Sequence, residues 1–358
     1  MTERTLASTY MHWAKTQTPA RLSLSSSEVP YFRLDRFDIG IADLELDGAS
    51  RYRDPELRAA IAAKNGVAPE QVVMADGASM ANMLAMAALI APGDAVLIEQ
   101  PAYEPMVATA LFLGADVRRF TRQGPDFAID SGILEAALTP DTRLIVLTNL
   151  HNPTGNFADA ATMRAVGALA DRVGARVLID EVYLDAVRPH QPSAVHLGDT
   201  FVCTSSLTKV YGLSGLRCGW ILASPELAEK MWRLNELFGV AQAHADERLS
   251  CIALARLDEV STRTSALLAC NRALANAFFA GRDDLEVAPM AHGITAFPQW
   301  LRGDADALHA LLRERHDTAI VPGRFFGLAD HFRIGVGGPT EMIEPALAQL
   351  GAGLNLLK

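Results

Sequence analysis

One short stretch of the chain holds the residues best suited to covalent chemistry. Lys209 lies three residues after Ser206 and eight before Arg217, in the run Ser206-Leu-Thr-Lys-Val-Tyr-Gly-Leu-Ser-Gly-Leu-Arg217. A lysine on a loop that leaves a strand can be desolvated and held near a neutral pKa, as an amine that forms a Schiff base requires. Serine and arginine bind phosphate well, the arginine through a two-pronged hydrogen bond. The run therefore predicts a reactive amine beside a phosphate site.

Other polar residues follow apolar runs elsewhere in the chain. We expect strands at 72–75, 95–98, 143–148, 176–179, 201–204 and 219–223, with helices at 80–90 and 160–173. Alternating strands and helices with continuously apolar strands are typical of an α/β fold, with a mostly parallel sheet and helices on both faces. In such sheets the ligand crevice lies at the carboxyl ends of the strands. The polar residues expected there are Gly77, Ala78, Ser79, Tyr103, Asn152, Asp180, Ser206 and Lys209.

The remainder of the chain predicts a second, smaller α+β domain. A helix-rich stretch at 231–279 precedes a mixed segment with apolar runs at 297–301 and 332–336. The first residues of the chain show no strand–helix alternation and are expected to pack with this segment. We therefore predict a large domain at 45–265 and a small domain built from 1–44 and 266–358.

Composition excludes several classes of protein. The chain has 358 residues, of which 50% are hydrophobic, and 42 acidic against 32 basic residues give a net charge of -10. Such a balance predicts no nucleic-acid partner and no anionic membrane surface. No apolar run reaches the ~18 residues of a membrane span, and the first 15 residues lack a signal peptide's apolar core. Four widely spaced cysteines without a CxxC pair favour reduced thiols, no metal site and a cytoplasmic location.

The run around Lys209 resembles the cofactor-lysine motif of fold-type I pyridoxal-phosphate (PLP) enzymes, specifically the class I/II aminotransferases. The resemblance covers nearly the entire chain, and further motifs follow in the family's order. Asn152-Pro-Thr-Gly resembles an element whose asparagine hydrogen-bonds the cofactor's phenolic oxygen, and Asp180-Glu-Val-Tyr183 resembles the family's Asp-x-x-Tyr. The resemblance implies that Asp180 pairs with the pyridine nitrogen and that Tyr183 reaches the phenolic oxygen. A carboxylate there keeps the ring cationic, so that it withdraws electrons from the substrate's Cα.

Weaker motifs complete the predicted site. Gly77-Ala78-Ser79 matches the phosphate-binding turn, Tyr103 stands where the family stacks an aromatic ring on the pyridine, and Arg333 aligns with the arginine for the substrate carboxylate. Tyr52 resembles the tyrosine given to the phosphate of the neighbouring subunit, which implies a homodimer. The predicted catalytic residues are Lys209, Asp180 and Tyr103; the cofactor-binding residues are Gly77, Ala78, Ser79, Tyr103, Asn152, Asp180, Tyr183, Ser206, Lys209, Arg217 and Tyr52; the substrate-binding residues are Arg333, Asn152 and Glu28.

The chain also departs from the family pattern. Where the family usually has a glycine, this sequence reads Leu24-Ser-Ser-Ser-Glu28-Val-Pro. Glu28 either contacts the substrate or lies in a solvated loop. The short loop at Asp54-Pro55 resembles that of histidinol-phosphate-type aminotransferases. His151 is expected to be structural, with a place on the pocket wall as the alternative, and 236–244 is a further candidate for specificity.

The motifs together predict an aminotransferase that moves the amino group of an amino acid to a 2-oxo acid through a Schiff base on Lys209. A PLP lyase, decarboxylase, cyclase or oxidase on the same fold is the alternative, because all share these cofactor contacts. A PLP-sensing transcription regulator is disfavoured, since the cofactor motifs begin by Gly77 and leave no room for a preceding DNA-binding domain. A nucleotide-binding protein is disfavoured because neither GxGxxG nor GxxxxGK[ST] occurs.

Overall fold

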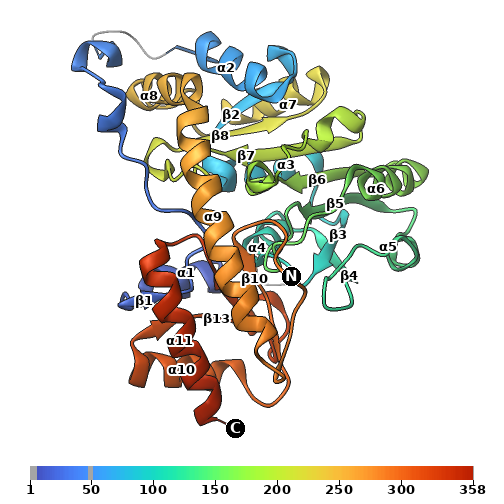
Figure 1. The fold of residues 1–358 in the computed structure, drawn as a ribbon. Coiled ribbons are helices and arrows are strands. Elements are labelled where there is room, and N and C mark those ends of the chain that lie inside the picture. Colours follow the sequence, from blue (N-terminus) through green and yellow to red (C-terminus); the bar gives the residue numbers. More distant parts are fainter. Residues whose placement is uncertain (1–5, 47–50, 358) are drawn as a thin grey trace.

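A seven-stranded sheet forms the larger part of the molecule (Figure 1). The computed structural model describes residues 6–46 and 51–357. The strands run in the order β2-β8-β7-β6-β5-β3-β4. Their bounds are β2 Val72–Asp76, β3 Ala95–Gln100, β4 Asp116–Thr121, β5 Thr142–Thr148, β6 Arg176–Asp180, β7 Phe201–Ser206 and β8 Cys218–Leu222. Neighbours from β7 to β4 are parallel, and only β8 runs antiparallel to its two neighbours in this sheet.

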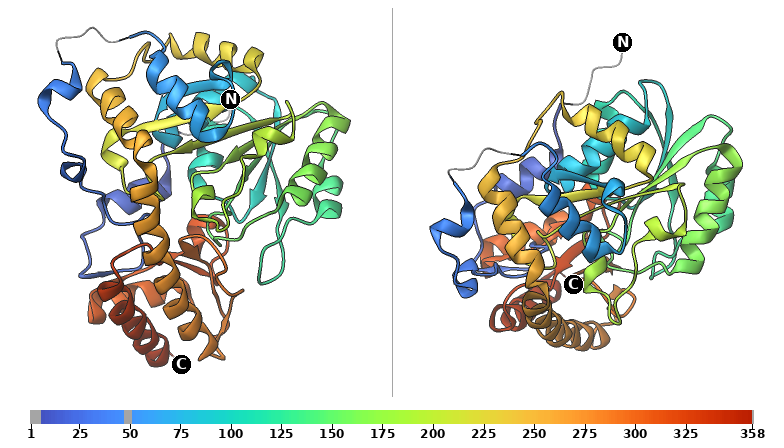
Figure 2. Two further views of the ribbon diagram at one scale, coloured as in Figure 1. Left: turned by 45° about the horizontal axis from the view of Figure 1, so that its top comes forward. Right: turned by 90° about the horizontal axis from the view of Figure 1, so that it is seen from above.

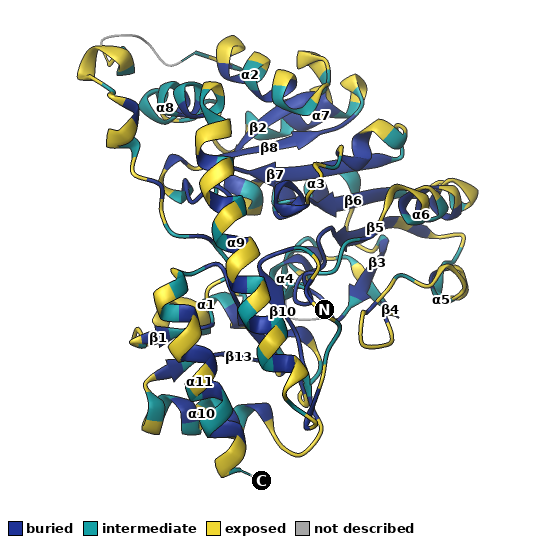
Figure 3. Cartoon of the chain, viewed as in Figure 1, coloured by how far each residue is buried: buried dark blue, intermediate teal, exposed yellow. Residues whose placement is uncertain are grey.

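Burial explains why most of these strands could be predicted and one could not. The central strands β6, β7 and β8 are buried along almost their whole length (Figure 3), as strands covered on both faces must be. Strand β4 lies at the sheet edge, with only β3 as its neighbour, and most of its residues are partly exposed. Arg118 and Arg119 interrupt its apolar pattern. The sequence analysis missed this strand for that reason.

Helices lie on both sides of the sheet (Figure 2), which confirms the predicted α/β fold. They are α2 Pro55–Asn65, α3 Gly77–Leu89, α4 Glu104–Phe112, α5 Ser131–Ala137, α6 Ala160–Val173, α7 Pro225–Asn235 and α8 His244–Ala255. Aspartates cap three of them: Asp54 accepts from Leu57 N at 2.9 Å, Asp130 from Gly132 N at 2.7 Å, and Asp159 from Thr162 N at 2.8 Å. Within the described ranges, no helix combines the length and apolar character that crossing a bilayer requires.

The second part of the fold has its own core. Its elements are α1 Thr9–Thr16, β1 Leu22–Ser23, β9 Leu285–Glu286, β10 Thr295–Ala296, β11 Gln299–Trp300, α10 Ala305–His316, β12 Thr318–Ala319, β13 Val321–Pro322, β14 Phe332–Gly335 and α11 Thr340–Leu356. The long helix α9, Leu257–Ala280, joins the two parts: Val260 packs in the core of the sheet and Phe279 in the second core. The N-terminal segment is divided, since Leu24 belongs to the second core and Phe32 to the first. The domain limits at 45 and 265 stay a prediction.

Candidate active site

A cavity of about 680 Å³ lies between the carboxyl ends of the parallel strands, the N-terminal segment and the second part of the fold. Ten predicted site residues line it: Glu28, Ala78, Ser79, Tyr103, Asn152, Asp180, Tyr183, Ser206, Lys209 and Arg217. They converge because parallel strands end at the same edge of the sheet. Gly77, Tyr52 and Arg333 are not on the cavity wall.

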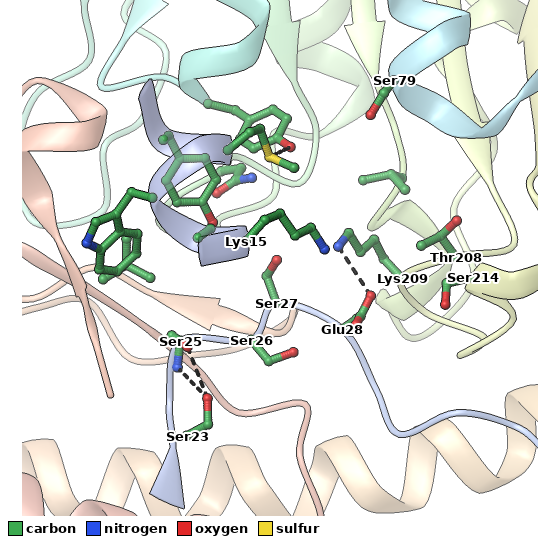
Figure 4. A pocket seen from close by; sticks show the side chains of 18 of the residues that line it. Lys15, Ser23, Ser25, Ser26, Ser27, Glu28, Ser79, Thr208, Lys209 and Ser214 are labelled. Carbon is green, nitrogen blue, oxygen red and sulfur yellow. Dashed lines mark hydrogen bonds and ion pairs between the residues drawn. The ribbon is translucent and has the colours of Figure 1, made fainter. Parts of the chain in front are cut away.

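Lys209 lies on the loop after β7 and points into this cavity (Figure 4). Its Nζ donates to Glu28 Oε2 at 3.4 Å. Burial lowers the pKa of Lys209, but the phenol of Tyr183 and the carboxylate of Glu28 outweigh burial, so the net pKa lies above the ordinary value. The sequence analysis expected a pKa near neutrality. That expectation concerns the amine beside its cofactor and stays a prediction, whereas here Tyr183 and Glu28 stabilise the charged form.

Asp180 ends strand β6 and is almost fully buried. Its carboxylate accepts hydrogen bonds from Asn82 Nδ2 at 2.8 Å and from Val182 N at 3.0 Å. Burial raises the pKa of Asp180, and the two hydrogen bonds and the charge of Lys209 oppose that rise. Both donors are neutral amides, so a cation on the cavity side would stabilise the ionised carboxylate.

Asn82 is a site residue that the sequence analysis missed. It lies on α3, and its Oδ1 accepts from Thr204 Oγ1 at 2.5 Å while its Nδ2 donates to Asp180. A strand, a helix and a second strand thus fix the orientation of one carboxylate. The available signal was a polar residue inside the apolar helical run at 80–90.

The start of α3 forms a concave site suited to an anion. Helix N-termini present free N–H groups, and Ser79 and Arg217 stand beside this one. Gly77 has φ +79°, and a Cβ there would lie 2.4 Å from Arg217 Nη2. A Cβ on Gly219 would lie 2.4 Å from the carbonyl carbon of Gly77. Only glycines therefore permit Arg217 and β8 to approach the turn this closely.

Arg333 lies behind the cavity wall, with 1% of its surface exposed. Its guanidinium donates to Asn152 Oδ1 at 3.1 Å, to the Tyr10 hydroxyl at 2.8 Å and to the Ser25 carbonyl at 3.0 Å. These three acceptors belong to residues that line the cavity, so Arg333 is one residue away from a ligand. Its Nε is buried and has no hydrogen-bond partner among the described residues.

Tyr103 and Tyr183 place two phenols in the cavity. Tyr103 packs edge-on against Tyr10 with ring centroids 5.9 Å apart, and burial raises its pKa well above the ordinary value. Burial also raises the pKa of Tyr183, which hydrogen-bonds Ser27. Both are therefore neutral hydroxyls at neutral pH. Tyr10 comes from α1 and was not predicted, because nothing in its sequence surroundings indicates a site.

Three further candidates lie away from the cavity. His151 is fully buried, contacting Thr154 Oγ1 at 2.8 Å and the Pro101 carbonyl at 3.0 Å, and it does not line the cavity. Burial lowers its pKa well below the ordinary range, which agrees with the structural role expected. The segment 236–244 is also absent from the cavity wall. Tyr52 is 48% exposed, and its hydroxyl donates to Glu236 on the surface.

The residues present fit PLP. The helix start with Ser79 and Arg217 offers a phosphate site that a Cβ at position 77 would fill, and Asp180 offers a buried carboxylate without a cationic hydrogen-bond donor. Lys209 supplies an amine within the same cavity. The sheet, the cavity at its carboxyl edge and these groups define a PLP enzyme of fold type I.

Comparison with known proteins agrees with this class. The family model of class I and II aminotransferases matches residues 45–350. Capreomycidine synthase from Streptomyces vinaceus is 33% identical over 94% of this chain and 90% of its own length. A histidinol-phosphate aminotransferase from Ralstonia nicotianae is 33% identical over 86% of this chain and 84% of its own length.

Solved structures show the same fold over the whole chain. A PLP-dependent aminotransferase from Streptococcus suis has a TM-score of 0.92 at 23% identity, covering 99% of both chains. The PLP-dependent cyclase OrfR has a TM-score of 0.88 at 25% identity, again covering 99% of both chains.

The chain belongs to the class I and II aminotransferase family. The family confirms the predicted enzyme class, a PLP-dependent aminotransferase, together with its cofactor and its substrate classes, an amino acid and a 2-oxo acid. The roles of the individual site residues stay a prediction.

Proposed function

We propose that this chain transfers the amino group of an amino acid to a 2-oxo acid, with Lys209 as the residue that holds PLP and moves the proton. The convergence of Lys209 and Asp180 in one cavity, with Arg333 directly behind its wall, carries the proposal. When bound, PLP supplies an electron sink for the substrate's Cα. Lys209 Nζ accepts the proton from Cα as general base and returns it as general acid.

The other residues hold and tune the cofactor in this proposal. Asp180 keeps the pyridine nitrogen protonated, and Asn152 and Tyr183 donate to the phenolic oxygen while Tyr103 packs on the ring. Arg333 attracts the substrate's α-carboxylate from behind the wall formed by Tyr10, Ser25 and Asn152. The phosphate is held by Gly77, Ala78, Ser79, Ser206 and Arg217.

We also propose a cytoplasmic homodimer in which Tyr52 binds the phosphate of the partner subunit. The exposure of Tyr52 and its position outside its own cavity support this arrangement. The free state of all four cysteines supports a reducing compartment.

The first test follows the absorbance of the purified holoenzyme while amino acids are added one at a time. We expect a suitable amino acid to remove the visible band, and a 2-oxo acid to restore it. Lys209→Ala should lower turnover by at least about 100-fold, because the proton carrier is lost. Lys230→Ala, on the exposed face of α7, is the matched lysine control and should retain turnover. Wild-type turnover in Lys209→Ala would contradict the proposal.

A PLP-dependent cyclase is a second candidate. At equal identity, capreomycidine synthase covers more of this chain than the histidinol-phosphate aminotransferase does, 94% against 86%. The fate of nitrogen separates the two activities. With a donor labelled with ¹⁵N at the amino group, an aminotransferase delivers the label to the 2-oxo acid, whereas a cyclase retains it in the product.

A further inference from the structure

The charges on the cavity wall leave one carboxylate without a role in holding the cofactor. Among the described residues, Glu28 and Asp180 are the only acidic side chains that line the cavity. Asp180 is assigned to the pyridine nitrogen. Glu28 is a quarter exposed and stands beside Lys209 on the side of the N-terminal segment (Figure 4).

Glu28 must lose its present counter-charge during the reaction. Among the described residues, Lys209 supplies the only ion pair of Glu28, at 3.4 Å. To accept a proton from the substrate's Cα, Lys209 Nζ has to be a neutral amine. In that state Glu28 faces the substrate as an unpaired, partly buried carboxylate, which is unfavourable unless another cation approaches.

Backbone contacts hold the main chain at Glu28 in place beside the cavity. Val29 N donates to the Lys209 carbonyl at 3.0 Å, which ties the segment to the lysine loop. On the other side, a Cβ on Gly337 would lie 2.3 Å from the Glu28 carbonyl oxygen, so the loop after β14 packs directly on this residue. Glu28 is thus held between the two parts of the fold.

Lys15 is the other candidate to neutralise Glu28. It lies on α1 and lines the cavity, but its side chain is exposed and forms no ion pair with Glu28 within 4 Å. Arg313, also on the wall, is bound to the Thr18 carbonyl at 2.9 Å and pairs with Asp317. Neither cation is held at the Glu28 carboxylate.

We propose that Glu28 binds a cationic group on the side chain of the donor, so that the preferred donors are amino acids with a side-chain ammonium or guanidinium. This inference rests on the proposed function, because it needs a donor whose Cα lies at Lys209. The hydroxyls of Ser26 and Ser27 stand next to Glu28 and give a polar surface along which such a side chain can lie (Figure 4).

A pair of unreactive ligands tests this binding without turnover. Pentanoate and 5-aminopentanoate both carry a carboxylate, neither has an α-amino group, and only the second has a terminal ammonium. We expect wild-type holoenzyme, followed by cofactor absorbance, to bind 5-aminopentanoate about 10- to 100-fold more tightly than pentanoate, as a charge-assisted hydrogen bond allows. Glu28→Gln should bring that ratio close to one, and Lys15→Met should preserve it.

The kinetic counterpart compares ornithine with norvaline, which differ by the terminal amine. The ratio of their kcat/KM values should fall about 10- to 100-fold in Glu28→Gln. An equal loss for both amino acids would overturn the inference, since Glu28 would then act on Lys209 or on the α-amino group. A cation preference that emerges only in Lys15→Met would also overturn it, because Lys15 would be the counter-ion. If the wild-type enzyme turns over amino acids but does not prefer ornithine to norvaline, this inference is wrong and the proposed function stands. If no amino acid changes the cofactor absorbance, the proposed function itself is wrong.

Discussion

Two carboxylates that are adjacent in sequence, Asp180 and Glu181, have different environments because they point to opposite sides of the chain at the end of β6. Asp180 faces the cavity and is bound by Asn82, whereas Glu181 points to the other side of the chain, where it accepts from Ala194 N at 2.8 Å. Successive side chains of an extended strand point to opposite faces, so one residue of displacement is enough. Burial raises the pKa of Glu181 to about 7.

Glu181 should therefore make stability depend on pH. Its folded-state pKa of about 7 lies above the ordinary value of 4.5, so the folded chain binds the proton more tightly than the unfolded chain. The contribution is complete below pH 4.5 and is lost as pH rises to about 7. We expect Glu181→Gln to weaken this decline, measured as the free energy of unfolding in urea at pH 5 and pH 8. The exposed Glu226→Gln is the control and should leave the decline as it is; a similar effect of both variants would contradict the assignment.

At the scale of elements, a buried ion pair joins three strands beneath the cavity. Glu99 at the end of β3 pairs with Arg122 just after β4 at 2.8 Å, and both side chains are 2% exposed. Glu99 Oε1 also accepts from the backbone N of Thr148, at the end of β5, at 2.7 Å. The pair therefore fixes the strand ends that precede Tyr103 and Asn152.

Arg122→Met should destabilise the fold by about 3–5 kcal/mol, because it leaves Glu99 buried and uncompensated. The measurement is the urea midpoint of the holoenzyme. The double variant Glu99→Gln with Arg122→Met removes both charges and should recover part of the loss. If the double variant is less stable than Arg122→Met alone, the charge of Glu99 is not the cause.

At the scale of the whole molecule, each cavity of the proposed dimer contains residues from both chains. Lys209→Ala disables a cavity in its own subunit, whereas Tyr52→Glu places a carboxylate against the phosphate of the partner subunit. A hybrid of the two variants then has one cavity with Lys209 from one chain and Tyr52 from the other. Co-expressed variants should regain activity in about a quarter of all cavities, since half of the dimers are hybrids.

The control for this experiment combines Lys209→Ala with Asp180→Ala. Both residues act in the cavity of their own chain, so no hybrid has an intact site and activity should stay absent. If Lys209→Ala with Tyr52→Glu is equally inactive, Tyr52 does not act across an interface.

The sequence by itself predicted the sheet, the family and the residues at the strand ends. Asp180 ends an apolar strand, and Asn152 and Lys209 lie in the loops that follow two others. The carboxyl ends of parallel strands meet at one edge of the sheet. Motif spacing within a strand and its following loop is a local property, and local patterns are visible in one sequence.

Contacts between distant segments were decided only by the tertiary structure. The pairing of Glu28 with Lys209 and the Tyr10 contact to Arg333 join residues 181 and 323 positions apart. The position of Arg333 behind the wall and the edge strand β4 likewise depend on packing partners. Hydrophobic periodicity predicts which face of an element is buried, but it does not predict which distant side chain contacts that face. The residues that contact the substrate are therefore known only from the way the two parts of the fold pack around the cavity.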